Sequence, residues 1–183
     1  MNQPESLPHP LQAFRYCAQC GNKGLEIRQT RSIYCPACGF CYFINCAAAV
    51  SGFVFYGDQL ILTVRAEDPQ KGYLDLPGGF VEFDESADDA LRREVMEELG
   101  LAVTDVSYLA SAPNSYLYAG VLYKTTDMFY VCRVDDISRI HAQDDVAGYR
   151  LADPHAMDPA TLAFPSARGV FGQLLRSIAP CSA

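Results

Sequence analysis

Hydrophobic and polar positions alternate in short stretches over most of the chain after residue 46, a pattern that favours β-strands. The run 47–55 is almost entirely apolar and predicts a buried strand, and 59–65 alternates like a partner strand. A helical period is found at 86–100 and 163–178. The other stretches divide into predicted strands, at 73–76, 102–112, 127–134 and 146–151, and predicted polar loops, at 66–72, 113–126 and 135–145.

The order of these elements, mostly strands with one helix in the middle and one at the end, predicts an α/β fold. A mixed sheet between two helices buries the apolar side of every element, so we expect an α/β/α sandwich over residues 47–183. Half of the 183 residues are hydrophobic and 20% are charged, which provides enough apolar side chain to fill such a core.

The charge and the ends of the chain narrow the range of partners. The net charge of −8 disfavours bulk nucleic acid or an anionic membrane surface as a partner. No apolar run reaches the length of a transmembrane helix. Residues 1–13 lack the basic and apolar segments of a signal peptide and are expected to form a flexible tail. These features predict a cytoplasmic protein with no membrane partner.

Three glutamates lie close together on the predicted central helix. Glu94, Glu97 and Glu98 are spaced i, i+3 and i+4, so at about 100° per residue they share one arc of the helix. Like charges in this arrangement destabilise a helix unless a cation joins them, and oxygen ligands suit Mg²⁺. A solvated acidic helix with i, i+4 pairing is the simpler interpretation of these three residues alone.

A longer pattern around the glutamates favours the metal-binding interpretation. It reads G-x5-E-x7-R-E-U-x-E-E-x-G-U, where U is apolar. This pattern resembles the signature of the Nudix hydrolases, which split a diphosphate bond with divalent metal ions, and the resemblance implies the Nudix α/β/α sandwich. All fixed positions are filled, by Gly79, Glu85, Arg93, Glu94, Val95, Glu97, Glu98, Gly100 and Leu101.

The resemblance implies a role for each charged residue of the pattern. Glu97 and Glu98 would be the main metal ligands, and Glu94 a further ligand or the group that helps to activate water. Glu85 would bind or orient metal, and Arg93 would hold the carboxylates in place by charge-assisted hydrogen bonds. Two or three Mg²⁺ or Mn²⁺ ions would neutralise the diphosphate, lower the pKa of a bound water and stabilise the leaving phosphate.

Two further contributions are implied outside the helix. The carbonyl group of Gly78 or Gly79 would complete the coordination of the metal. The general base varies in place within the family. Here Asp145 and its neighbour Asp144 are candidates for a late metal ligand or a base, and an exposed acidic loop is the alternative interpretation of both.

The cysteines form a second constellation. Cys17 and Cys20 lie in one CxxCG turn, and Cys35 and Cys38 lie in another, 14 residues further along. Four thiolates at this spacing predict one structural Zn²⁺ ion in a zinc ribbon over residues 14–46. A redox CxxC pair or a disulfide is the alternative, which two matched turns in a cytosolic-looking chain disfavour.

The ribbon leaves two questions open. Cys41 follows Cys38 at the same spacing, so it is an alternative ligand, and both Cys41 and Cys46 could also be small buried apolar residues. The segment 15–31 holds four basic residues and one acid, which favours weak contact with phosphate or nucleic acid. A stabilising or dimerising cap is the preferred interpretation, because ribbons this small need metal to fold.

A ribbon ahead of a Nudix domain is similar to the NADH pyrophosphatases and to ribbon-bearing ADP-ribose and FAD pyrophosphatases. The NADH enzymes carry S-Q-P-W-P-F-P-x-S after the glutamates, whereas this chain has no tryptophan and reads SAPNSY at 111–116. We therefore expect ADP-ribose or a dinucleotide such as FAD or NADH, bound around residues 114–130. Asn114, Tyr116 and Tyr118 are the candidate contacts, although such tyrosines also pack against their own domain.

Other functions stay open at this point. Hydrolysis of nucleoside triphosphates or RNA caps is one, and the basic ribbon favours it. A non-catalytic Nudix module that senses nucleotide or nucleic acid is another, but such modules usually have a degraded signature. A homodimer is a further possibility, because dimers are common in the group that this chain resembles.

Overall fold

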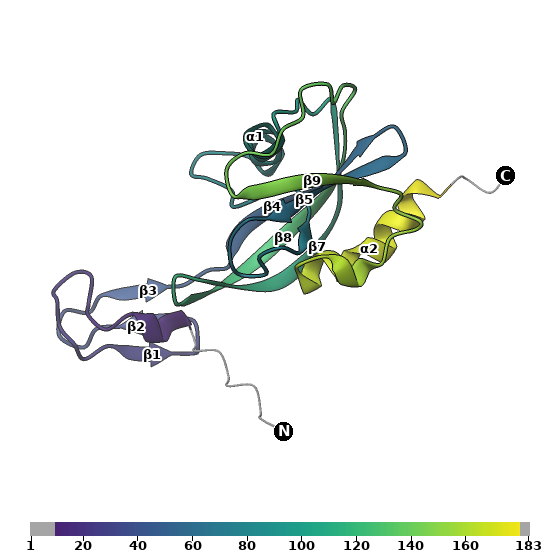
Figure 1. Ribbon diagram of the computed structural model, residues 1–183. Helices are drawn as coiled ribbons and strands as arrows, with labels where there is room; N and C mark the ends of the chain where they lie inside the picture. Colours follow the sequence, from purple (N-terminus) through teal and green to yellow (C-terminus); the bar gives the residue numbers. More distant parts are fainter. Residues whose placement is uncertain (1–9, 180–183) are drawn as a thin grey trace. The chain divides into compact units, whose positions relative to one another are not determined.

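The computed structural model describes residues 10–179, which divide into two compact units. We name the first the cysteine unit, formed in its described part by residues 10–46 and 115–124. The second, the sheet unit, comprises residues 47–114 and 125–179. Both are drawn in Figure 1. Within the described range, no helix has both the length and the apolar character needed to cross a membrane.

The sheet unit is built on a mixed β-sheet. Its strands follow the order β6-β5-β4-β8-β7, and β9 pairs with β5 off this path. β4 and β8 are parallel, whereas β5 runs antiparallel to β4, β6 and β9. The strands are β4 (Ala47–Tyr56), β5 (Gln59–Arg65), β6 (Leu74–Asp75), β7 (Asp105–Tyr118), β8 (Val121–Arg133) and β9 (Val146–Ala152).

Alternation along β4 supplies both faces of the sheet with apolar side chains. Val50 and Val54 join one buried cluster with helix α1 (Ala87–Leu99), and Phe53 and Phe55 join another with helix α2 (Pro165–Ile178). Successive residues of a strand point to opposite faces, so the two helices cover opposite sides of the sheet, as Figure 1 shows. The predicted α/β/α sandwich with a mixed sheet is confirmed.

Helix α2 is joined to the sheet by a buried polar contact. Asp127 on β8 accepts hydrogen bonds of 2.6 Å from the hydroxyl groups of Thr125 and Ser166. Ser166 lies in the first turn of α2, so the carboxylate also sits near the positive end of the helix dipole. A short 3₁₀ helix, η2 (Pro159–Thr161), precedes α2.

The prediction of a polar loop at 113–126 is wrong. β7 extends to Tyr118, β8 begins at Val121, and the two strands are neighbours in the sheet. Ala119 and Gly120 join them with positive φ angles of 48° and 78°, as a two-residue hairpin turn requires. The polar serines and threonines suggested a loop, whereas the tyrosines and leucines between them favour strands.

The cysteine unit contains a small antiparallel sheet of three strands in the order β1-β2-β3. The strands are β1 (Glu26–Arg28), β2 (Ser32–Tyr34) and β3 (Cys41–Phe43). Residues 10–13, which were expected to belong to a flexible tail, form the 3₁₀ helix η1 (Pro10–Ala13) with Leu11 buried. The rest of the predicted tail, residues 1–9, lies outside the described residues, as does Cys181.

Candidate active site and cysteine cluster

The loop before α1 lies against β4. The N–H groups of Gly52 and Val50 each donate a 2.8 Å hydrogen bond, to the carbonyl oxygens of Pro77 and Gly79 respectively. Gly78 has a φ of 151°, and a Cβ there would lie 2.1 Å from the carbonyl oxygen of Val50. A Cβ at Gly79 would lie 2.4 Å from a carboxylate oxygen of Glu94. Position 78 therefore needs glycine, because its φ and the adjacent backbone of Val50 leave no room for a side chain, whereas a side chain at position 79 would require the Glu94 carboxylate to shift.

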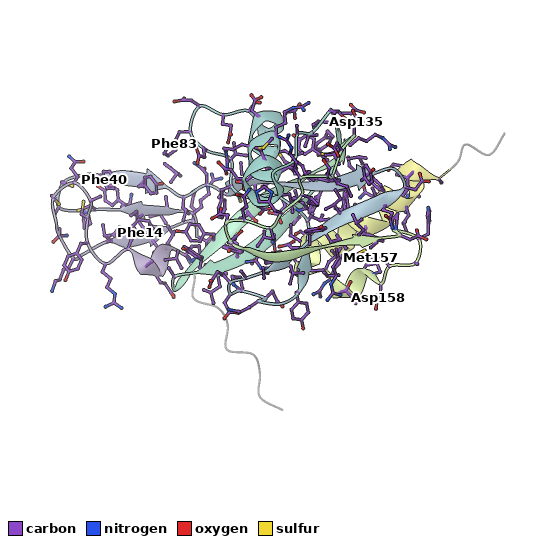
Figure 2. All side chains as sticks on the ribbon, turned by 45° about the horizontal axis from the view of Figure 1, so that its top comes forward. Phe14, Phe40, Phe83, Asp135, Met157 and Asp158 are labelled. Atoms are coloured by element: carbon purple, nitrogen blue, oxygen red, sulfur yellow. The ribbon has the colours of Figure 1, made fainter. Side chains whose placement is uncertain are left out.

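Helix α1 begins and ends at the predicted residues. The Ser86 side chain accepts a 3.2 Å hydrogen bond from the N–H of Asp89, and Gly100 ends the helix in the left-handed conformation. Phe83, in the preceding loop, is fully exposed (Figure 2). The apolar stripe of Leu91, Val95 and Leu99 is buried, which fixes the rotation of the helix and hence the direction of its glutamates.

Arg93 is the centre of the carboxylate cluster. It binds Glu85 through two hydrogen bonds, of 2.9 and 3.0 Å. It also donates to Glu94 at 2.8 Å and to Glu97 at 2.9 Å. The hydrogen bonds to Glu85 raise the pKa of Arg93, and in return the Arg93 hydrogen bond lowers the pKa of Glu85. One cation thus holds three carboxylates, in a forked geometry that lysine does not reproduce.

Glu98 is the most deeply buried of the helix carboxylates, with 6% of its surface exposed. It accepts a 3.3 Å hydrogen bond from the N–H of Gly78. Burial, followed by the charges of Asp145 and Glu94, raises its pKa to about 9. Burial also raises the pKa of Glu94. A divalent cation would favour the charged form of both groups, so this donor set fits a hard metal ion with oxygen ligands.

A small cavity of about 30 Å³ opens beside Glu98. The predicted residue Asp145 lines it together with Glu98 and Gly78. Asp145 directly precedes β9, and the pairing of β9 with β5 brings it close to these two residues, which are distant from it in the sequence. Asp144 is not among the lining residues. The structure therefore places Asp145, rather than its neighbour, with the carboxylates of α1.

Sequence reasoning missed Asp75, which lines the same cavity. Its carboxylate pairs with Arg65 at 3.0 Å, and burial raises its pKa to about 6 against the opposing effect of Arg65. The available signal was an acidic residue between two leucines, directly before the Pro-Gly-Gly turn. A carboxylate in such a half-buried strand requires a partner, which Arg65 on β5 supplies.

A larger cavity, of about 880 Å³, lies at the other end of β4. Its lining includes Phe55 and the β4–β5 turn, whereas the carboxylates lie beside Val50 and Gly52. It contains none of the predicted site residues. Size alone therefore does not identify the reaction site, and the clustered carboxylates do.

The predicted substrate contacts are divided between the units. Tyr116 and Tyr118 belong to the cysteine unit, where their rings stack with centroids 6.2 Å apart and planes inclined by 19°. Asn114 belongs to the sheet unit. The cavity beside Glu98 has none of the three among its lining residues.

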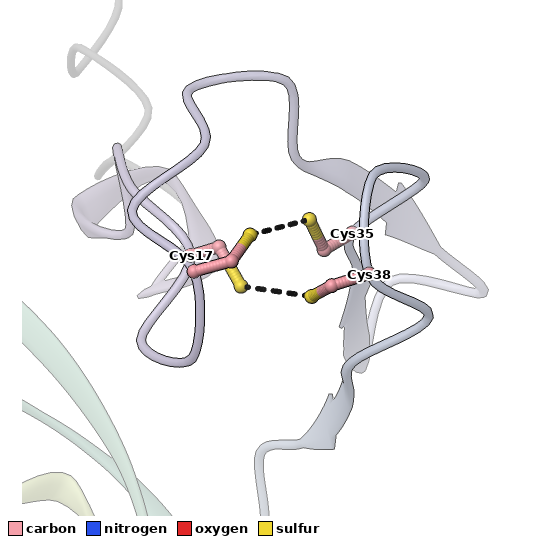
Figure 3. Close-up of side chains that lie close together, drawn as sticks. Cys17, Cys35 and Cys38 are labelled. Carbon is pink, nitrogen blue, oxygen red and sulfur yellow. Dashed lines mark hydrogen bonds between the residues drawn. The ribbon is translucent and has the colours of Figure 1, made fainter.

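The four predicted cysteines form one cluster (Figure 3). The sulfur atoms of Cys17, Cys20, Cys35 and Cys38 all lie within 4.8 Å of one another, and two of the pairs are 3.7 Å apart. A disulfide needs about 2.0 Å, whereas tetrahedral Zn²⁺ with bonds of about 2.3 Å puts sulfurs roughly 3.8 Å apart. The spacing therefore fits metal coordination and excludes a disulfide in these pairs.

The electrostatics of the cluster support the same conclusion. Burial opposes ionisation of Cys35, but the N–H groups of Cys38 and Ala37 outweigh it and lower the pKa of the thiol to about 6. At Cys38 the N–H of Phe40 lowers the pKa, but burial and the neighbouring sulfurs raise it to about 12. A cation among the sulfurs would remove this conflict. Cys41 and Cys46 are exposed and are not members of the cluster.

The fold and the carboxylate helix define a class of proteins, and comparison with known proteins agrees. Residues 47–172 match the NUDIX domain, so the chain belongs to the Nudix hydrolase family. A crystal structure of a NUDIX hydrolase from Nitrosomonas europaea superposes with a TM-score of 0.66 and 22% identity, covering 89% of each chain. The NUDIX domain of Shewanella oneidensis NrtR complexed with ADP ribose gives 0.58 and 20%, covering 80% of this chain and 94% of that one.

Among curated proteins, the chain is similar to enzymes named NAD-capped RNA hydrolase NudC. The one from Pseudomonas putida (strain W619) is 34% identical over 97 residues, which are 53% of this chain and 35% of that protein. The one from Haemophilus influenzae (strain PittGG) is 30% identical over 111 residues, 59% of this chain and 42% of that protein. The chain thus spans well under half the length of these relatives.

Proposed function

We propose that this protein is a divalent-metal-dependent pyrophosphohydrolase that splits the diphosphate linking a nucleoside to a second group. The observation that carries this proposal is the carboxylate cluster of α1, with a buried Glu98 whose pKa is raised to about 9 beside Asp145 and the backbone of Gly78. A cluster of carboxylates around a buried Glu98 is electrostatically costly without a cation, and a diphosphate needs cations to be attacked by water.

Each residue has a proposed task. Glu97 and Glu98 would hold Mg²⁺ or Mn²⁺. Glu94 would be a further metal ligand or would help to activate water, and Glu85 would bind or orient the metal. Bound Mg²⁺ or Mn²⁺ would supply Lewis-acid stabilisation of the phosphates and lower the pKa of a bound water. Arg93 would hold the carboxylates in position through its hydrogen bonds to three of them.

The backbone contacts distinguish the two glycines as carbonyl ligands. The carbonyl of Gly79 already accepts a hydrogen bond from Val50. In the described part of the chain, no hydrogen bond reaches the carbonyl of Gly78. We therefore favour Gly78 as the carbonyl ligand, because its lone pairs remain available. Asp145, directly before β9, is the proposed late ligand or general base.

For the cysteine cluster we propose one structural Zn²⁺ ion held by Cys17, Cys20, Cys35 and Cys38. The support is the 3.7 Å sulfur–sulfur distances and the position of the cluster between the two CxxCG turns of a three-stranded sheet. Four protein ligands leave no open position, which is typical of a structural rather than a catalytic site.

The preferred substrates are dinucleotides of the NAD or FAD type and ADP-ribose. The curated relatives are named NAD-capped RNA hydrolases, and NAD is a dinucleotide joined by a diphosphate. The tryptophan-containing motif of the NADH enzymes is absent from this sequence, so ADP-ribose and FAD remain candidate substrates together with NADH. The alternatives, nucleoside triphosphates and other RNA caps, differ in which phosphate bond is broken.

A substrate panel with Mg²⁺ or Mn²⁺ tests the proposal. It should contain ADP-ribose, NADH, NAD-capped RNA, FAD, diadenosine polyphosphates and a nucleoside triphosphate, with products identified by mass spectrometry. Glu98→Gln is expected to lower turnover at least a hundredfold, about the effect of losing one electrostatic catalytic element. Glu67→Gln is the matched control, because Glu67 is an exposed glutamate outside the cluster, and it should keep full activity.

The competing function is a non-catalytic module that senses nucleotide. Its expected result is binding of a panel member by calorimetry without turnover in either metal. Turnover that Glu98→Gln leaves unchanged would also contradict the proposed site, because the activity would then come from elsewhere.

A further inference from the structure

The charge of the cysteine unit is opposite to that of the protein as a whole. Its described residues include five basic side chains, Arg15, Lys23, Arg28, Arg31 and Lys124, and a single acidic one, Glu26. The whole chain carries −8. A positively charged module on an acidic protein attracts polyanions locally while the rest of the protein repels them, so any polyanion contact is directed to this unit.

One face of the three-stranded sheet combines this charge with aromatic rings. Residues directly opposite each other in antiparallel strands share a face. Register therefore places Arg28, Ser32 and Phe43 in one row, and Tyr34 in the next row of the same face. The guanidinium of Arg28 lies over the Tyr34 ring at 3.5 Å, and Phe43 is 52% exposed. Arg28 and Phe43 are thus exposed on either side of Ser32, which is itself buried, and the Arg28 guanidinium covers the half-buried Tyr34 ring.

Further basic and aromatic side chains adjoin one another in the same unit. Lys23 lies over the ring of Tyr16 at 5.4 Å, and Tyr16 is 55% exposed. At the hairpin tip, Tyr118 stacks on Tyr116 and is 57% exposed. Rings with nearby cations are the elements that bind unstacked bases and phosphates together.

We infer that the cysteine unit binds single-stranded RNA, with the face formed by Arg28, Tyr34 and Phe43 as its stacking platform. Stacking on an open sheet face and phosphate contacts by flanking lysines and arginines need no fixed base sequence. Double-stranded RNA fits less well, because its bases are already stacked within the duplex and cannot stack on the exposed rings. The inference is independent of catalysis, since binding is a property of this unit.

The test is fluorescence anisotropy of a labelled oligouridylate of about 12 nucleotides, at about 50 mM salt where phosphate contacts are strong. The full-length Glu98→Gln protein is used without added Mg²⁺, so that turnover does not enter. Phe43→Ala should weaken binding about tenfold, the scale of one lost base stack. Arg31→Gln should lower the slope of log K against log salt by about 0.7.

Two controls have opposite expectations. Glu26 pairs with Arg28 at 3.0 Å, so Glu26→Gln should release this arginine and tighten RNA binding. Arg150→Gln, an exposed arginine of β9 in the sheet unit, should leave the affinity unchanged. Native mass spectrometry of each variant should show the same bound metal as the parent protein, which separates a lost contact from a lost fold.

Two results would overturn the inference. One is the absence of RNA binding at low salt by a protein that holds its metal. The other is a homodimer that Phe43→Ala dissociates in sedimentation experiments while the RNA affinity is unchanged, which would make this face a subunit interface. A protein that binds RNA but hydrolyses no panel substrate would contradict the proposed function and leave this inference standing.

Discussion

The two units are stabilised by different means. The sheet unit has two apolar clusters of twelve buried residues each, one under each helix. In the cysteine unit, the buried apolar side chains apart from the cysteines are few, with Leu11, Ile33 and Leu122 the large ones among the described residues. Every residue of β1 and β3 is exposed. We expect a unit this poor in apolar core to need a bound metal ion in order to fold, whereas the sheet unit can carry the cost of a buried carboxylate such as Glu98.

The largest expected effect is the unfolding of the cysteine unit when the proposed zinc ion is removed. Zinc contributes about 10–16 kcal/mol to folding in comparable sites, so Cys17→Ser/Cys20→Ser should unfold this unit. Native mass spectrometry should show one ion lost, and hydrogen exchange should show amide protection lost at 26–43 but kept at 50–62. Cys41→Ser, outside the cluster, is the control. Protection that survives without metal would show that apolar contacts suffice.

The reverse experiment removes apolar core from the sheet unit. Phe53 is fully buried and lies 6.0 Å from Phe129 and 6.1 Å from Phe171, measured between ring centroids. Phe53→Ala should lower the free energy of unfolding of this unit by about 3–5 kcal/mol, through lost contacts and the cavity left behind. Urea denaturation, monitored by hydrogen exchange of the amides of the sheet unit, measures this loss in the free energy of unfolding. Phe83→Ala, at a fully exposed position, should cost almost nothing.

The buried carboxylates should make the stability of the sheet unit depend on pH. The pKa of Glu98 is about 9 in the folded protein, above the value of roughly 4.3 for an unfolded chain. The folded state therefore binds the proton of Glu98 more tightly than the unfolded chain does. The stability that this proton adds to the folded state is complete below about pH 4 and is lost as the pH rises toward 9. Without added divalent ions, the melting temperature should fall over this range.

Two comparisons sharpen this pH experiment. Glu98→Gln should flatten the profile and raise the melting temperature at high pH, because the neutral amide no longer has to be ionised in a buried site. Saturating Mg²⁺ should flatten the wild-type profile as well. A steep profile that persists in Glu98→Gln would assign the dependence to other groups, such as Asp75, whose pKa is also raised, to about 6.

The smallest expected effect concerns the start of α1. Ser86 caps the helix through the N–H of Asp89, so Ser86→Ala should cost about 1 kcal/mol of stability in the sheet unit alone. Ser86→Thr retains a capping hydroxyl and should cost less. Equal losses for the two variants, measured by thermal unfolding, would show that the capping hydrogen bond contributes little.

Features with a short repeat were predictable from the sequence. The i, i+3, i+4 spacing of Glu94, Glu97 and Glu98, the cap residues Ser86 and Gly100, and the two CxxCG turns all express local geometry. The same holds for the alternation that builds both faces of β4. Such patterns are visible because one turn of helix or one pleat of strand involves only neighbouring residues.

Features that depend on distant pairing came from the tertiary structure. Pairing of β5 with β6 and β9 places Asp75, Arg65 and Asp145 around Glu98, and no local spacing relates these segments. The hairpin turn at Ala119–Gly120 extends two strands through a segment that looked like a loop. The sequence by itself thus determined the family and the chemical groups. Only the tertiary structure decided which groups are buried together, because burial and pairing depend on contacts between residues far apart in the chain.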